Sequence, residues 1–161
     1  LSLLVEQSAD LIKACTPKST KLVFDLDKTI PETKADREQI QQILLNLVKN
    51  ASEAIGNKNG NIRISTGHDY FSSDSLSSVF QNGQPTAGRY CFLDVADDGC
   101  GMDEETKKRL FEPFFSTKFV GRGLGMSAVM GIVKTHRGVI KIDSSKGDGT
   151  TIRVLLPTAT T

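Results

Sequence analysis

Apolar and polar residues alternate in five short segments of the chain, and this pattern predicts five β-strands. The expected strands cover residues 21–27, 61–65, 90–96, 139–143 and 151–156. Helices are expected over residues 2–14, 36–55, 104–110 and 124–135. The segment 71–88 is rich in Ser, Gly, Asn and Gln, which predicts a flexible loop. Together these elements indicate an α+β fold, a mixed sheet with helices on one face.

The predicted helix 36–55 has a narrow polar stripe beside a broad apolar face. Asp36 is a suitable N-cap and Gly56 a suitable end for this helix. Asn46 and Asn50 lie in the stripe, at the edge of the apolar face, and we expect them to be half-buried. A half-buried amide needs a partner, so these asparagines either cap nearby backbone or face a ligand. An asparagine carbonyl is a neutral oxygen ligand, suited to Mg²⁺ whose charge phosphates already balance.

An acidic residue ends the predicted strand 90–96. Asp97 falls on the same face of that strand as Leu93 and Val95, which are suited to a core. Gly99 and Gly101 follow at once and permit tight turns and close approach of the backbone. A buried carboxylate in this position can accept a hydrogen bond from an exocyclic amine such as adenine N6. Taken alone, the same residues also suit an ordinary aspartate turn.

Glycines precede the last predicted helix. Gly121, Gly123 and Gly125 would expose backbone N–H groups at the start of that helix, where phosphate is the expected ligand. No strand precedes them at dinucleotide-binding spacing, and no Gly-Lys-Ser/Thr follows, so neither of those phosphate motifs fits. Lys118 and Arg122 flank the loop and are either phosphate ligands or ordinary surface charges.

Composition sets looser bounds on the protein. A chain of 161 residues predicts one domain. The net charge of +1 gives no case for nucleic acid or for direct contact with an acidic membrane surface. Cys15, Cys91 and Cys100 lack the spacing of a zinc site and are expected to be free thiols. No apolar run approaches the ~20 residues of a membrane span, so neither a membrane span nor a signal peptide is expected in this sequence. Because the chain starts at Leu1, we expect a fragment of a longer protein.

Taken together, the motifs resemble the ATP-binding catalytic domain of sensor histidine kinases of the nitrogen-regulator-like subgroup. That family lies within the gyrase, heat-shock chaperone and MutL-like ATPase superfamily. The resemblance covers about residues 20–156 and implies a single domain over 1–161 with an α/β sandwich of the Bergerat type. The matching segments are, in order, Asn46–Ala54, Asp97–Met102, Leu110–Lys118, Gly121–Met126 and Gly147–Thr150.

The resemblance implies roles for individual residues in binding Mg²⁺-ATP. Asp97 should bind adenine N6, Asn50 should hold Mg²⁺, and Asn46 should lie near the phosphates. A mobile lid over about 103–123 should close on the nucleotide. The remaining expected nucleotide-site residues are Ala54, Gly99, Gly101, Met102, Lys118, Gly121, Arg122, Gly123, Leu124, Gly125, Met126 and Thr150. The family pattern has a small residue at position 122 and commonly Gly at position 137, where this chain has Arg122 and Arg137, so the turn at 137 is expected to be altered.

Position 46 separates branches of the superfamily. Hydrolysing relatives have a Glu there that acts as general base on water, and an asparagine amide has no comparable basicity. The resemblance therefore implies γ-phosphate transfer to a histidine on a separate helical-hairpin domain, without a catalytic residue of this chain. Neither His68 nor His136 lies in a phosphoacceptor motif, and we expect both to be structural or exposed. A slow ATPase and a non-catalytic ATP sensor remain as alternatives.

The resemblance also implies partners and location. The expected partners are the kinase's own histidine-bearing hairpin domain and the receiver domain of a response regulator. The isolated domain is expected to be a monomer and the parent kinase a dimer. The expected location is the cytoplasmic face, whether the parent is anchored in a membrane or free of it.

Overall fold

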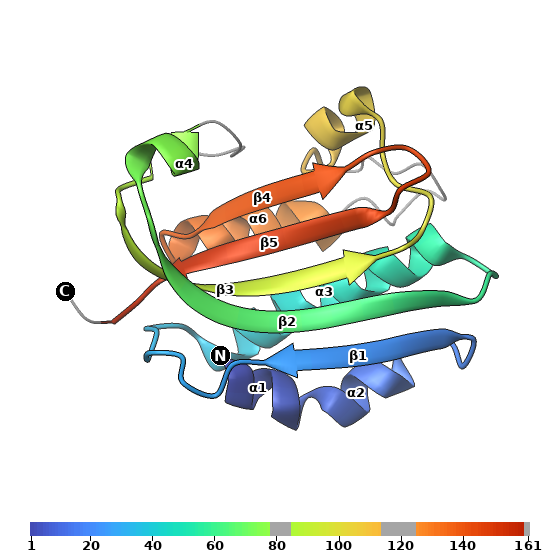
Figure 1. The fold of residues 1–161 in the computed structure, drawn as a ribbon, viewed down its shortest axis with the longest axis horizontal. Coiled ribbons are helices and arrows are strands. Elements are labelled where there is room, and N and C mark those ends of the chain that lie inside the picture. Colours follow the sequence, from blue (N-terminus) through green and yellow to red (C-terminus); the bar gives the residue numbers. More distant parts are fainter. Residues whose placement is uncertain (78–84, 114–124, 160–161) are drawn as a thin grey trace.

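The five predicted strands form one mixed sheet in the order β1-β2-β3-β5-β4 (Figure 1). The computed structural model describes residues 1–77, 85–113 and 125–159. Strands β1 and β2 pair in parallel, and all other neighbours are antiparallel. The strands are β1 (Thr20–Leu26), β2 (Gly60–Phe71), β3 (Gly88–Asp97), β4 (Val139–Ser144) and β5 (Thr150–Pro157).

Two long helices, α3 (Arg37–Ile55) and α6 (Gly125–Thr135), lie side by side against one face of this sheet (Figure 1). Their apolar stripes and the inward-facing strand residues form the main core. The most deeply buried of these side chains include Ile43, Leu44, Leu47, Val129, Val133, Ile62, Ile64, Leu93, Ile140 and Val154. The predicted α+β architecture is therefore confirmed.

Helix α3 begins and ends as its sequence predicts. The Asp36 side chain accepts a hydrogen bond from the backbone N–H of Gln39 at 3.0 Å, which satisfies one of the free donors of the first turn. Gly56 ends the helix with a φ of 68°, a conformation that glycine adopts without a steric penalty.

The single helix predicted for residues 2–14 is wrong in one respect, because the segment forms two short helices. These are α1 (Ser2–Gln7) and α2 (Ala9–Ala14), which meet at Ser8. Ser8 is almost completely buried, and its hydroxyl accepts a hydrogen bond from the Gln41 side chain of α3 at 3.2 Å. This contact holds the junction of the two short helices against α3.

The prediction of a loop over residues 71–88 also needs correction. Strand β2 continues to Phe71, β3 already starts at Gly88, and a short helix α4 (Ser73–Ser77) lies between them. Strand alternation places Tyr90 and Leu155 on the sheet face opposite the main core. Leu76 of α4 packs against them and is fully buried, so an apolar side chain within a polar segment accounts for the extra order.

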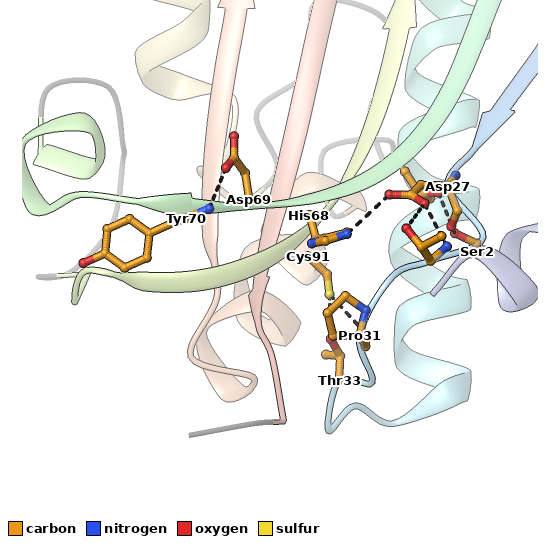
Figure 2. A network of polar contacts seen from close by, with 10 residues as sticks. Ser2, Asp27, Pro31, Thr33, His68, Asp69, Tyr70 and Cys91 are labelled. Atoms are coloured by element: carbon orange, nitrogen blue, oxygen red, sulfur yellow. Dashed lines mark hydrogen bonds and ion pairs between the residues drawn. The ribbon is translucent and has the colours of Figure 1, made fainter.

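The connector from β1 to α3, residues 27–36, is held to the sheet at its start by polar contacts (Figure 2). The backbone N–H of Asp27 donates to the Thr66 hydroxyl at 3.1 Å, and the Asp27 carbonyl accepts from the Ser2 hydroxyl at 2.5 Å. His68 Nε2 lies 3.6 Å from a carboxylate oxygen of Asp27. His68 therefore has a structural contact, as expected.

Further along, the connector contacts β3 and the end of the chain. The Thr33 hydroxyl donates to the Cys91 sulfur at 3.3 Å, and that thiol donates to the Pro31 carbonyl at 3.4 Å (Figure 2). Burial raises the pKa of the Cys91 thiol, so the group stays protonated and able to donate. The backbone N–H of Ala159 donates to the Glu32 carbonyl at 2.8 Å. These contacts fix the path by which the chain enters α3.

Candidate functional site

The predicted acidic residue lies where β3 ends, beside the start of β5. Asp97 is paired in register with Ile62 of β2 and Thr150 of β5, both buried. Its Oδ1 atom accepts a hydrogen bond from the Gly99 N–H at 2.8 Å. Burial raises the pKa of Asp97 to about 6, an effect that the charge of Asp98 reinforces and that hydrogen bonds from the Gly99 and Thr150 backbone oppose.

This environment leaves Asp97 able to accept one more partner. An ionised carboxylate has about four acceptor positions, and the backbone groups of Gly99 and Thr150 use two of them. Desolvation strengthens any further hydrogen bond that reaches the carboxylate, because the competing water is partly excluded. A donor such as an exocyclic amine would therefore be bound favourably here.

The neighbouring acidic residue, Asp98, is hydrogen-bonded to Asn61 of β2. Asp98 is exposed, and its two carboxylate oxygens accept from the backbone and side-chain amide of Asn61, each at 2.8 Å. These hydrogen bonds hold the pKa of Asp98 below its ordinary value. Of the two adjacent aspartates, only Asp97 has the half-buried surroundings of a ligand-binding carboxylate.

The glycine that follows lies directly on the end of α3. A methyl group at Gly99 would stand 2.6 Å from the carbonyl carbon of Ala54, a distance at which atoms overlap. The next residue, Cys100, donates its backbone N–H to the Ala54 carbonyl at 3.1 Å. The expected site residues Ala54 and Gly99 are thus brought together by backbone contact.

The β4–β5 turn closes over the same loop. Gly101 has a φ of 69°, and a methyl group there would stand 2.0 Å from the Ser145 carbonyl oxygen. The backbone N–H of Gly147 donates to the Cys100 carbonyl at 2.6 Å. Gly101 is therefore required both by its left-handed conformation and by the space available.

Ser144 is a residue of this region that the sequence did not single out. Its buried hydroxyl accepts from the Met102 N–H at 2.9 Å and lies 3.1 Å from the Gly149 carbonyl and 2.7 Å from the Thr150 hydroxyl. Ser144 therefore connects the loop after β3 to the start of β5. In the sequence, Ser144 was marked only by its position directly after the predicted strand 139–143.

The two asparagines of α3 are half-buried, as expected. Within residues 1–77, 85–113 and 125–159, no hydrogen bond from the Asn46 or Asn50 side chain is observed. The Asn46 Oδ1 atom lies 3.6 Å from the place where a Cβ of Gly125 would stand, at the start of α6. Capping of nearby backbone by these two side chains is therefore not seen in the described part of the chain.

The described residues fit a magnesium ion that arrives with phosphates. They contain no cluster of His, Cys, Asp or Glu side chains that would hold a metal by themselves. Asn50 offers one neutral oxygen, and Mg²⁺ is commonly bound by one or two protein ligands together with substrate phosphates. A single amide oxygen of this kind would be one protein ligand among several supplied by phosphates and water.

Part of the predicted site lies outside the described residues, namely Lys118, Gly121, Arg122, Gly123 and Leu124. Residues 114–123 of the predicted lid lie there too. Its described portion comprises the helix α5 (Glu104–Arg109), capped by the Asp103 side chain, followed by the buried Leu110. The Met126 side chain belongs to the main core, so this residue has only its backbone to offer a ligand.

The turn after α6 keeps a left-handed residue although that residue is not glycine. Arg137 has a φ of 56° and is the only non-glycine residue with positive φ in the described segments. The Gly138 N–H donates to the Val133 carbonyl at 2.8 Å, and the Arg137 N–H donates to the Lys134 carbonyl at 3.0 Å. This pair of bonds is the usual left-handed helix ending, so the expected alteration of the turn is not observed.

Across the described helices, none is long and apolar enough to cross a membrane.

Comparison with known proteins shows the family to which the chain belongs. Residues 35–160 match the family model for histidine kinase-, DNA gyrase B- and HSP90-like ATPases. The signal transduction histidine-protein kinase AtoS of Escherichia coli K12 is 34% identical over 158 residues, which cover 98% of this chain and 23% of AtoS. The sensory histidine kinase/phosphatase NtrB of Rhodobacter capsulatus is 36% identical over 141 residues, which cover 86% of this chain and 37% of NtrB. The chain thus spans less than two fifths of the length of these relatives.

Solved structures of histidine kinases share the fold. The catalytic domain of histidine kinase ThkA superposes with a TM-score of 0.68 at 28% identity, covering 96% of this chain and 88% of that domain. The full-length ShkA structure, in complex with AMPPNP, superposes with a TM-score of 0.74 at 23% identity, covering 99% of this chain and 30% of ShkA. The mycobacterial kinase MprB gives 0.70 at 19% identity, covering 96% and 93%. At these lower identities the likeness concerns the fold alone.

Proposed function

The chain belongs to the histidine kinase-, DNA gyrase B- and HSP90-like ATPase family, as a domain of the sensor histidine kinase type, and from this premise we propose that it binds Mg²⁺-ATP at Asp97 and donates the γ-phosphate to a histidine on a separate domain. The observation that carries the proposal is the half-buried Asp97 carboxylate, which keeps acceptor capacity beside a loop where glycine backbone alone fits.

In this proposal, one group of residues binds the adenine base and another group binds the triphosphate. Asp97 accepts the adenine N6–H, and the neighbouring Thr150 and Met102 lie around the base. Asn50 would hold Mg²⁺, which would supply charge neutralisation to the triphosphate. Asn46 and the first amides of α6 at Gly125 face the phosphates, where the positive end of the helix dipole favours anions.

The residue at position 46 favours transfer to a protein over transfer to water. An asparagine amide does not remove a proton from water at neutral pH, so hydrolysis lacks a general base at this position. Transfer to a neutral histidine nitrogen needs no such base. The domain then contributes orientation of the γ-phosphate and neutralisation of its charge, which are the main requirements of phosphoryl transfer.

The acceptor histidine belongs to another domain. His136 has both ring nitrogens engaged within this fold, and His68 lies against Asp27, so neither suits the role. We therefore propose that the partners are the histidine-bearing hairpin domain of the parent kinase and, after it, a receiver domain. We further propose that the isolated domain is a monomer within a dimeric parent and that it acts at the cytoplasmic face.

Phosphotransfer in trans tests this function. The chain is incubated with γ-labelled ATP, Mg²⁺ and the hairpin domain of its own parent kinase, with a hairpin lacking the histidine as control. We expect acid-labile, alkali-stable label on the intact hairpin only, at a rate that rises with hairpin concentration because no tether holds the two domains together. Brisk hydrolysis by the chain alone would indicate an ATPase. Nucleotide binding without any transfer would indicate an ATP sensor.

A further inference from the structure

We propose that His136 is a positioning residue that sets the axial register of α6 on α3, and thereby the place of the α6 N-terminus relative to Asn46. This inference rests on the proposed function, because it assigns the phosphate-binding geometry to a contact at the far end of the two helices. His136 itself touches neither the nucleotide nor Mg²⁺.

The two helices run antiparallel, with α6 lying beside the first half of α3. Asp36, at the start of α3, contacts His136 just after α6, and Asn46 lies beside Gly125 at the start of α6. The ten residues from Asp36 to Asn46 span about 15 Å, and the eleven from Gly125 to His136 span about 16 Å at 1.5 Å per residue. If α6 slides along α3 at the Asp36–His136 contact, Gly125 therefore moves by the same distance relative to Asn46.

The imidazole of His136 makes a directional contact in a single tautomer. The backbone N–H of Asp36 donates to His136 Nε2 at 3.0 Å, so Nε2 is unprotonated. His136 Nδ1 lies 2.8 Å from the Ile132 carbonyl and donates its proton there. The ring is thus fixed on α6 by one nitrogen and bound to the first turn of α3 by the other.

Apolar packing between the two helices does not by itself select one axial position of α6 on α3. Ile43, Leu47, Val129 and Val133 pack together, but apolar burial is non-directional and has alternative packings along a helix axis. The Asp36 N–H is fixed in turn, because the Asp36 side chain caps α3. A hydrogen bond from this fixed donor selects one axial position of α6.

The chain offers variants that separate this role from simple stabilisation. His136→Gln keeps an acceptor at about the reach of Nε2 and loses the bond to Ile132. His136→Asn is too short to reach Asp36 and keeps a donor near Ile132. Thr135→Val is the matched control. Thr135 lies at the same exposed helix end, and its hydroxyl donates to the Gly131 carbonyl within α6 at 3.0 Å, so the variant loses a hydrogen bond that does not reach α3.

Calorimetric titration of a non-hydrolysable ATP analogue and of adenosine into the full chain provides the test, with unfolding measured in parallel. We expect His136→Asn to weaken binding of the ATP analogue about fivefold and to change adenosine binding less than twofold, with His136→Gln and Thr135→Val close to wild type. Equal losses for both ligands, or a Gln variant no better than Asn, would overturn the proposal. So would unchanged binding of the ATP analogue by His136→Asn. A wild-type chain that binds neither ligand would instead refute the proposed function on which the inference depends.

Discussion

The Asp97 carboxylate accepts a hydrogen bond from the backbone N–H of Gly99, two residues further along the chain, at 2.8 Å. This is the contact of an ordinary aspartate turn, yet it occurs in a half-buried carboxylate whose pKa is raised to about 6. The turn and the ligand-binding role are therefore compatible. The turn bond fixes the orientation of the carboxylate while leaving it able to accept a ligand.

Replacing Asp97 by Asn should weaken nucleotide binding. The adenine amine would lose a charge-assisted acceptor, which costs about 1.5–3 kcal/mol, or roughly 10- to 150-fold in affinity. Titration of an ATP analogue measures this change. Asp98→Asn is the control, since Asp98 is exposed and bonded to Asn61, and it should bind nearly as wild type. Equal affinity of wild type and Asp97→Asn, with the fold intact, would refute the adenine role.

The same substitution should change the pH dependence of stability. Because the pKa of Asp97 is raised from 3.8 to about 6, the folded state binds this proton more tightly than the unfolded state does. The resulting stability is fully present below pH 3.8 and is lost as pH rises through about 6. Between pH 4 and 7 the unfolding free energy of wild type should therefore fall by about 1–3 kcal/mol relative to Asp97→Asn, allowing for partial solvent screening. Urea unfolding at several pH values measures it, and parallel curves for the two proteins would contradict it.

Asn50 should serve the metal more than the base. Asn50→Ala removes the proposed oxygen ligand of Mg²⁺, and Asn50→Asp adds a negative charge beside the triphosphate. Asn50→Ala should weaken nucleotide binding in Mg²⁺ more than in EDTA, whereas Asn50→Asp should weaken it more in EDTA, where no cation offsets the added charge. Asn57→Ala, at an exposed position just beyond α3, is the control. Losses of the same size in the two buffers would show that Asn50 does not act through the metal.

Arg137 should be a position where glycine stabilises the fold. A left-handed conformation costs a non-glycine residue about 1–2 kcal/mol, part of which is offset because glycine makes the unfolded chain more flexible. Arg137→Gly should raise the unfolding free energy by about 0.5–1 kcal/mol. Arg137→Ala should leave it unchanged if backbone conformation, and not charge, is the cause. Thr135→Gly, at the last residue of the helix, should lower it by about 0.3 kcal/mol, the difference in helix propensity between Thr and Gly. Denaturant unfolding gives all three values, and a destabilised Arg137→Gly would show that the backbone is not strained there.

Two glycines of the β4–β5 turn should respond differently to alanine. Gly147 and Gly149 both have positive φ, of 90° and 82°. A methyl group at Gly147 meets nothing within 4 Å, whereas at Gly149 it would stand 2.2 Å from the Asp97 carbonyl oxygen. We expect Gly147→Ala to cost about 1 kcal/mol of stability, from its backbone conformation alone. Gly149→Ala should cost several-fold more and also weaken nucleotide binding, because it displaces Asp97. Similar losses for the two variants would contradict the close packing of this turn.

Most of the fold follows from local patterns in the sequence. Strand alternation, the helical spacing of apolar residues and the caps at Asp36 and Gly56 are local properties, so the five strands and the long helices followed from them. The break at Ser8 and the helix around Leu76 did not follow. Both depend on burial against distant residues, Gln41 in one case and Tyr90 in the other.

For the candidate site, the sequence identified residue types and the tertiary structure decided which of them meet. Strand alternation already places Asp97 on the core face, but nothing local to Asp98 shows that it is bonded to Asn61. The need for glycine at position 99 arises only because the end of α3 lies against it at Ala54. The contact of His136 with Asp36 spans 100 residues. Such relationships depend on how the helices and the sheet pack, because desolvation, steric exclusion and hydrogen bonding act between neighbours in space.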